Sequence, residues 1–210
     1  MLRGIRNIIF DLGGVIINID YHLCVESFRK IGMENFDSLY SKARQNDLFD
    51  QLEKGRVLRK DFYNRLRPYL KNNVHEEEIE AAWNAMLLDI PKERLLFLEK
   101  LKSRFRLFLL SNTNEIHLSA INSYLRAEHN LTGLSHLFEK EYLSCRIGMR
   151  KPDRELFDYV LADSSISAEE TLFIDDSPQH IEGAAQSGIR SYLLEKEKSI
   201  NELLTPDLLA

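Results

Sequence analysis

Short, mostly apolar runs occur at four places along the chain, and each run ends at small or polar residues. A run of this length without regular polar alternation is typical of a strand that is buried on both faces, as in a parallel sheet. The pattern therefore predicts four strands. They cover residues 6–10, 106–110, 171–174 and 190–194.

Amphipathic helical patterns separate these runs in the second half of the chain. Strands that alternate with helices are joined by right-handed crossovers and form a doubly wound sheet. We therefore expect a Rossmann-like α/β core with a parallel sheet. Its helices are predicted over residues 92–102, 115–128, 154–162 and 178–186.

Residues 21–89 carry helical patterns only. A helical insertion of this size after the first strand would form a small bundle beside the sheet. We therefore predict a core domain made of residues 1–19 and 90–210, and a helical cap subdomain made of residues 20–89. The cap helices are expected over residues 21–31, 36–45, 60–70 and 76–88.

The composition indicates a soluble, folded protein. Of the 210 residues, 44% are apolar and 29% are charged, and the formal net charge is −5. This acidic balance argues against nucleic-acid binding, which usually needs a basic face. Cys24 and Cys145 are too few for a disulfide framework, and the apolar residues 8–19 are too short to span a bilayer. We expect a cytoplasmic protein without a membrane partner; the oligomeric state stays open.

Polar side chains follow three of the predicted strands directly. Asp11 follows the first strand, Ser111 the second, and Asp175 and Asp176 the third. In a doubly wound sheet the carboxyl ends of the strands share one edge, and ligands bind there. We therefore expect these side chains to converge.

The residue types at this edge suit phosphoryl transfer, which needs a nucleophile, a cation and hydrogen-bond donors around the phosphate. Asp11 is the candidate nucleophile, since carboxylates form acyl-phosphate intermediates. Asp175 and Asp176, together with Asp11, offer hard oxygen ligands for Mg²⁺. Lys151 is the candidate positive charge.

Neutral donors are also available beside Asp11. Glycine permits close approach of a ligand to the backbone, so the turn Leu12-Gly13-Gly14 can aim its N–H groups at an anion. Ser111 and Asn112 supply further donors.

Four sequence segments carry a resemblance to a known family. They are Ile8-Ile9-Phe10-Asp11-Leu12-Gly13-Gly14-Val15-Ile16, Leu110-Ser111-Asn112, Lys151-Pro152 and Ile174-Asp175-Asp176-Ser177-Pro178. Together and in this order they resemble the four motifs of the haloacid dehalogenase-like hydrolases with a helical cap. Ser-Asn-Thr-Asn at 111–114 and Gly-Met-Arg-Lys-Pro at 148–152 are most similar to sugar phosphatases of the α-D-glucose-1-phosphate phosphatase type.

The resemblance implies a role for each matching residue. Asp11 would be the nucleophile and a metal ligand, with the Gly13 carbonyl, Asp176 and Asp175 as the other ligands or their neighbours. Ser111 and the Asn112 amide would hold phosphoryl oxygens, and Lys151 would offset negative charge. The implied enzyme is a Mg²⁺-dependent phosphatase that hydrolyses small phosphorylated metabolites, sugar phosphates first, through an aspartyl-phosphate on Asp11.

Two positions depart from the family pattern. Most phosphatases of this family carry a second Asp two residues after the nucleophile, as general acid and base, where this chain has Gly13. General acid–base catalysis raises the reaction rate roughly 10²–10⁴-fold. Without this Asp, either the leaving group needs little protonation or the cap supplies an acid. His180 stands where many members carry Asp or Asn.

Other functions remain open at this stage. Dehalogenation uses a similar Asp but has no need of the acidic pair Asp175 and Asp176. A phosphomutase would need the acid that Gly13 lacks, and a non-catalytic binding module would not need Lys151. In the cap, a polar and aromatic stretch could touch the substrate; it contains Arg44, Asp47, Phe49, Glu53 and Gly55.

Overall fold

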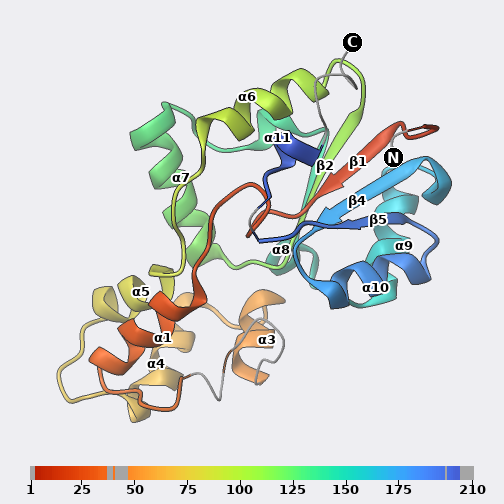
Figure 1. Cartoon of the computed structure of the whole chain (residues 1–210). Coiled ribbons are helices and arrows are strands. Elements are labelled where there is room, and N and C mark those ends of the chain that lie inside the picture. Colours follow the sequence, from red (N-terminus) through yellow and green to blue (C-terminus); the bar gives the residue numbers. More distant parts are fainter. Residues whose placement is uncertain (1–2, 37–39, 41–46, 197, 204–210) are drawn as a thin grey trace.

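A computed structural model describes residues 3–36, 40, 47–196 and 198–203. Five parallel strands form one sheet in the order β3-β2-β1-β4-β5, with the first strand of the chain at its centre (Figure 1). The predicted doubly wound α/β fold is confirmed. The strands are β1 (Asn7–Phe10), β2 (Arg106–Ser111), β3 (Lys140–Leu143), β4 (Thr171–Asp175) and β5 (Arg190–Leu193).

Four of these strands match the predicted runs to within one residue at each end. The sequence prediction missed β3, whose residues Lys140 to Leu143 include two charged side chains. This strand lies at the edge of the sheet, where charged residues are tolerated because one side of the strand faces solvent. An apolar-run criterion therefore cannot detect it.

Alternate residues of the central strand face opposite layers of helices. Ile8 and Phe10 pack in one cluster with residues of α6, α7 and α11, while Ile9 packs in another with residues of α9 and α10. Figure 1 shows these two groups of helices on opposite sides of the sheet. Burial of both faces explains why the strand lacks polar alternation.

The core helices agree closely with the helical patterns of the sequence. None of the helices in the described part of the chain is long and apolar enough to cross a bilayer. The bounds are α6 (Lys92–Leu101), α7 (Glu115–His129), α8 (Ser144–Ile147), α9 (Arg154–Asp163), α10 (Pro178–Gln186) and α11 (Ile200–Leu203), with 3₁₀ turns at Ser135–Leu137 and Ala168–Glu170.

Between β1 and α6 the described residues form helices and connecting turns, with no named strand. The helix predicted over 60–70 ends earlier and continues as a 3₁₀ turn, Arg67–Tyr69, whereas that predicted over 36–45 lies mostly outside the described residues. The segment around Phe49, expected as an irregular stretch, is a helix instead. The helices are α1 (Tyr21–Lys30), α3 (Asp47–Glu53), α4 (Arg59–Leu66) and α5 (Glu76–Asn84).

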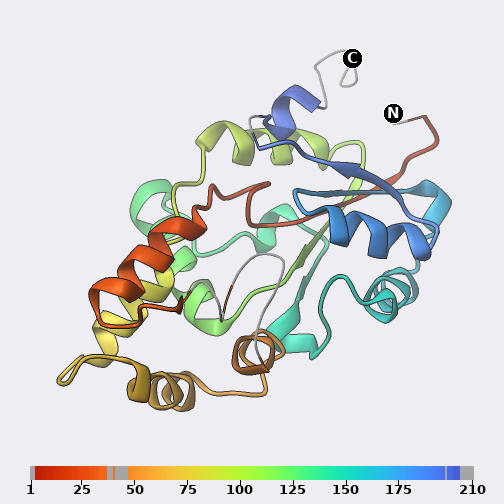
Figure 2. The same cartoon turned by 60° about the horizontal axis from the view of Figure 1, so that its bottom comes forward.

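These helices share a hydrophobic cluster of their own, which includes one residue of α7, Ile116. Trp83 is fully buried and its ring lies 4.8–6.4 Å from four aromatic neighbours in this cluster. Figures 1 and 2 show α1, α4 and α5 grouped on the side toward which the strands point. The separate cluster supports the division into a core (1–19 and 90–210) and a cap (20–89), which stays a prediction.

His117 of α7 joins the helical cluster to the core. Its ring stacks on Trp83 with 4.7 Å between centroids, and its Nε2 lies 3.3 Å from the Trp83 carbonyl oxygen. The Trp83 indole donates to Asn114 Oδ1, which also accepts from the first turn of α7. Burial lowers the pKa of His117 to about 4, although the bond to Trp83 raises it. The ring is therefore neutral at pH 7.

We expect His117 to make folding pH-dependent between pH 6.5 and 4. The folded-state pKa of about 4 lies below the usual value for histidine, about 6.5, so the unfolded chain binds more protons than the folded chain in this window. The free energy of unfolding therefore decreases as the pH falls from 6.5 to 4. Replacing His117 by Gln should reduce the loss between pH 7 and 5 by about 2 kcal/mol. Urea titrations at both pH values measure this, with His22→Gln as the exposed control; equal losses in both variants would contradict it.

Candidate active site

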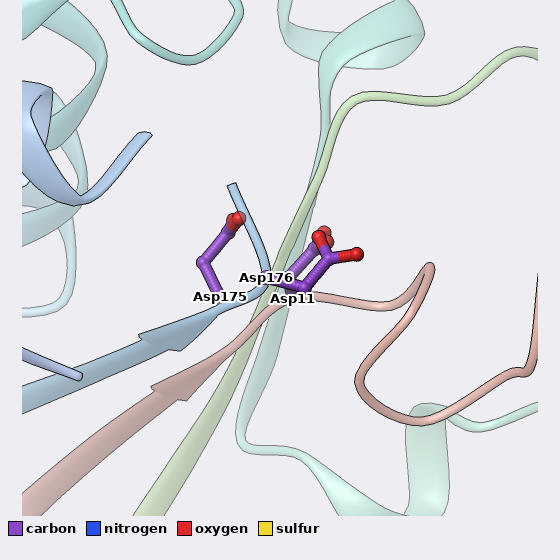
Figure 3. Close-up of side chains that lie close together, drawn as sticks. All are labelled: Asp11, Asp175 and Asp176. Atoms are coloured by element: carbon purple, nitrogen blue, oxygen red, sulfur yellow. The ribbon is translucent and has the colours of Figure 1, made fainter. Parts of the chain in front are cut away.

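The candidate site lies between β1 and β4, where the order of the strands in the sheet reverses. The strands β2 and β3 extend to one side of β1, and β4 and β5 extend to the other. Phe10 pairs with Ile174, so Asp11 and Asp175 emerge next to each other. Figure 3 shows Asp11, Asp175 and Asp176 at the same end of the sheet. This is the position at which doubly wound sheets bind ligands.

Lys151 connects two of these carboxylates. Its side chain is 0% exposed, and its Nζ lies 2.6 Å from Asp11 Oδ1 and 2.7 Å from Asp175 Oδ2. The third bond of the ammonium goes to the Leu110 carbonyl oxygen at 3.0 Å. All three donors are therefore used, and the charge is held in one place.

The buried charges shift one another's pKa values. Burial disfavours the Lys151 ammonium, but Asp11 and Asp175 outweigh it and raise the pKa of Lys151. Burial likewise disfavours ionised Asp175, yet Lys151 and His180 hold the pKa of that carboxyl below its usual range. For Asp11, burial prevails over Lys151 and raises the pKa to about 7. A cation beside Asp11 would favour its ionised form.

His180 lies on the far side of Asp175. Its Nδ1 is 2.9 Å from Asp175 Oδ1 and 3.0 Å from Oδ2, and the Ser177 amide donates to Oδ1. Burial, then Lys151, lower the pKa of His180, so the neutral ring carries its proton on the nitrogen that faces the carboxylate. With these partners Asp175 is suited to fixing Lys151 and His180, whereas Asp11 and Asp176 are better placed as metal ligands.

The acidic cluster fits a divalent metal ion, with Asp11 and Asp176 as the ligands and Asp175 beside them. One oxygen from each of Asp11, Asp175 and Asp176 lies within 4.8 Å of the other two, and such hard oxygen ligands suit Mg²⁺. Asp176 also lies directly against the turn after β1. A Cβ added to Gly14, whose φ is +78°, would be 2.1 Å from Asp176 Oδ2. A side chain at position 14 would therefore displace the Asp176 carboxylate from this position.

The amides of Leu12 and Gly13 remain available for an anion. Within the described part of the chain neither amide donates a recorded hydrogen bond, whereas the Gly14 amide is used by the Ile17 carbonyl. The Leu12 side chain is buried in the core cluster. Its predicted role as a phosphate-binding residue therefore rests on its backbone alone.

The side chain of Asn112 makes two hydrogen bonds that the sequence did not predict. Its side-chain amide donates to the Lys151 carbonyl oxygen, and its Oδ1 accepts from the Lys151 amide, both at 2.9 Å. The side chain therefore positions Lys151, while the backbone amide of Asn112 stays a candidate donor to phosphoryl oxygens. Ser111 is buried at the end of β2.

Three cap residues face the same cavity as Asp11 and Asp176. This cavity of about 60 Å³ is lined on the cap side by Tyr21, Tyr40 and Glu53. Of the cap candidates, Glu53 reaches the site, whereas Phe49 is in the aromatic cluster and Arg44 lies outside the described residues. Arg150 lines the cavity from the core, and the sequence prediction missed it; its position next to Lys151 was the available signal.

Comparison with known proteins establishes the family. Residues 5–188 match the family model of the haloacid dehalogenase-like hydrolases, and the chain belongs to this family. It is 32% identical to D-ribitol-5-phosphate phosphatase from Bacteroides thetaiotaomicron, over 96% of this chain and 97% of the relative.

Solved structures agree with this placement. A haloacid dehalogenase-like family enzyme from Bacteroides thetaiotaomicron, a variant solved with magnesium and inorganic phosphate, is similar with a TM-score of 0.90 and 35% identity, over 96% of this chain and 99% of that one. A haloacid dehalogenase-like hydrolase from Porphyromonas gingivalis gives 0.87 and 32%, over 97% and 98%. The predicted enzyme class, a phosphatase of this family, and the predicted cofactor, Mg²⁺, are confirmed.

Replacing Gly14 by Ala should displace Asp176 and weaken Mg²⁺ binding about 10–100-fold, as disturbed metal surroundings do. The physical reason is the 2.1 Å approach of the new Cβ to Asp176 Oδ2. Gly4→Ala is the matched control, because Gly4 has a similar φ of +80° and nothing within 4 Å of an added Cβ. Calorimetric titration with Mg²⁺ measures the effect; unchanged affinity in Gly14→Ala would contradict this prediction.

Proposed function

We propose that this protein hydrolyses phosphate monoesters of small sugar-like metabolites, with Asp11 as the attacking nucleophile. The observation that supports it most directly is the contact of Asp11 with the buried Lys151, beside a cluster of acidic ligands. The similarity to a D-ribitol-5-phosphate phosphatase favours a sugar or polyol phosphate as the substrate. We infer a cytoplasmic enzyme, in keeping with its two free cysteines.

Each residue of the site has a separate role in phosphoryl transfer. Asp11 attacks phosphorus and forms an aspartyl-phosphate, while the bond to the alcohol oxygen breaks. Lys151 holds one Asp11 oxygen, which leaves the other to attack, and its charge offsets that of the phosphoryl group. The amides of Leu12 and Gly13 would donate hydrogen bonds to phosphoryl oxygens. Mg²⁺, held by Asp11, Asp176 and the Gly13 carbonyl, would neutralise phosphate charge as a Lewis acid.

Water then releases phosphate from Asp11 in a second step. Neither step has a carboxylic acid at position 13, because that residue is glycine. The alcohol must therefore leave as a weakly assisted alkoxide or take a proton from another group. A phosphate ester of a polyol has a basic leaving oxygen, which needs a proton. The polar cap residues in the same cavity are therefore candidates for donating it.

Asp11→Asn should lower kcat by at least about a thousandfold, because the neutral amide cannot form the acyl phosphate. Acid-quenched wild-type enzyme should carry phosphate on Asp11, and the variant should carry none, by mass spectrometry of the peptide. Asp158→Asn, which alters an exposed ion pair with Arg154, is the control. An unchanged rate in Asp11→Asn would assign the activity to another site.

The absence of an acid at position 13 should make the first step sensitive to the leaving group. We expect kcat/KM for aryl phosphates to fall steeply as the leaving group becomes more basic, since the help of a general acid, roughly 10²–10⁴-fold, is missing. Gly13→Asp should flatten this dependence if the carboxyl reaches the leaving oxygen. A flat dependence in the wild type would mean that another residue already donates the proton.

Removal of the metal separates this function from dehalogenation. Phosphate release should stop with EDTA and return with added Mg²⁺, because the acidic cluster needs a cation to accept a phosphate dianion. Metal-independent release of halide from a haloacid would reverse the assignment. Formation of an isomeric sugar phosphate in place of free phosphate would indicate a mutase.

A further inference from the structure

The cavity wall opposite the acidic cluster contains an ion pair that phosphoryl transfer does not explain. Arg150 Nη2 lies 3.1 Å from Glu53 Oε2, and Arg150 Nη1 lies 3.1 Å from Asp50 Oδ1. Glu53 is 4% exposed, and Arg150 is 17% exposed at its side chain. Burial of two opposite charges is costly unless polar groups surround them. The pair therefore forms a polar part of the cavity lining. We call Glu53, Arg150 and Asp50 the polar wall; its Glu53 and Arg150 line the cavity that contains the candidate phosphate position.

The chain backbone holds this wall close to the core. The turn after α3 rests on the backbone of α8, where a Cβ added to Gly55 (φ +67°) would lie 2.0 Å from the Cys145 carbonyl oxygen. Glu53 is the last residue of α3, two positions before that contact. Its carboxylate is thereby placed beside Arg150, the residue next to the buried Lys151.

The polar groups of this wall suit hydroxyl groups. Glu53 offers carboxylate oxygens as acceptors. Arg150 Nε is buried and has no hydrogen-bond acceptor among the described residues, so it can donate. Tyr21 and Tyr40 line the same cavity. Burial, followed by nearby carboxylates such as Asp176 and Glu53 respectively, raises the pKa of each phenol, so both keep their protons.

The charges of the polar wall and of Lys54 cancel. Glu53 and Asp50 contribute two negative charges, and Arg150 and Lys54, which pairs with Asp50, contribute two positive charges. These four side chains together therefore have no net charge to attract a second anionic group. A carboxylate or second phosphate on the leaving group would find no unpaired cation among the described residues that line the cavity, because Arg150 is paired with Glu53 and Asp50, and Lys151 with Asp11 and Asp175. A neutral alcohol that carries hydroxyl groups needs no such cation.

We propose that Glu53 and Arg150 form the leaving-group subsite of this enzyme and select neutral, hydroxylated alcohols, such as polyols and small sugars, over anionic or purely aliphatic ones. This subsite rests on the proposed function, because it deals with the alcohol side of the same ester.

A neighbouring cavity is the competing position for the leaving group. It has a volume of about 460 Å³ and shares Tyr21 and Asp176 with the first cavity. Lys196 lines it, but Asp11 does not. Since the leaving oxygen must lie opposite the attacking Asp11 oxygen, the cavity that contains Asp11 is the better candidate.

Three esters of equal chain length test the selectivity: glycerol 3-phosphate, 3-phosphoglycerate and propyl phosphate, with an aryl phosphate as reference. For the wild type with Mg²⁺, we expect kcat/KM for glycerol 3-phosphate to exceed the other two by about tenfold or more, the value of one to two hydrogen bonds. Equal kcat/KM for the three esters would overturn the subsite while leaving the phosphatase function intact. No hydrolysis of any ester, the aryl phosphate included, would overturn both.

Two variants break the same ion pair but leave opposite charges. Glu53→Gln leaves Arg150 positive, so hydrolysis of 3-phosphoglycerate should rise about tenfold relative to propyl phosphate. Arg150→Met leaves Glu53 negative, so the same ratio should fall. Loosening of the cap alone would shift both variants in the same direction, and that result would overturn the proposal.

The controls separate this wall from its surroundings. Glu80→Gln, in the cap, breaks a more exposed pair with Arg59 away from the cavity and should leave all ratios unchanged. Inhibition by inorganic phosphate should stay within about twofold in Glu53→Gln, since the phosphoryl contacts lie on the core. If Lys196→Met, and not Glu53→Gln, changed the ratios, the neighbouring cavity would hold the leaving group and the proposal would be wrong.

Discussion

The buried ammonium of Lys151 is the interaction on which the candidate site depends. It reaches Asp11 at the end of β1, Asp175 at the end of β4 and the carbonyl of Leu110 in β2. An unpaired charge at this depth would cost several kcal/mol. The three neighbouring strands must therefore end in register for Lys151 to be buried at all, and the parallel pairing of β1 with both neighbours provides that register.

The same arrangement explains why so many groups around the site have fixed partners. Asn112 holds the backbone of Lys151, and His180 with the Ser177 amide holds Asp175. A charge that is fixed before the substrate arrives need not reorganise during the reaction. The cap completes the site from the other side, where Glu53 meets Arg150 across the Gly55 contact with α8.

Sequence reasoning succeeded where local patterns carry the information. The buried runs before Asp11, Ser111 and Asp175 became strands because sheets covered on both faces need continuous apolar segments. It failed at β3, an edge strand with charged residues, and at α3, where Phe49 and Leu52 point into the cap cluster from a short segment. Such elements form because the rest of the fold offers them a partner, which no local pattern reveals.

The sequence by itself determined the family, the strand ends and the candidates for the reacting groups, because each motif is a short segment whose chemistry is read directly. Only the tertiary structure decided which partners the side chains of the site contact. It assigned the Asn112 side chain to Lys151, committed Asp175 to Lys151 and His180, and placed Arg150 against Glu53. These pairings join residues 5 to 97 positions apart, so they depend on packing between elements and not on the spacing of residues along the chain.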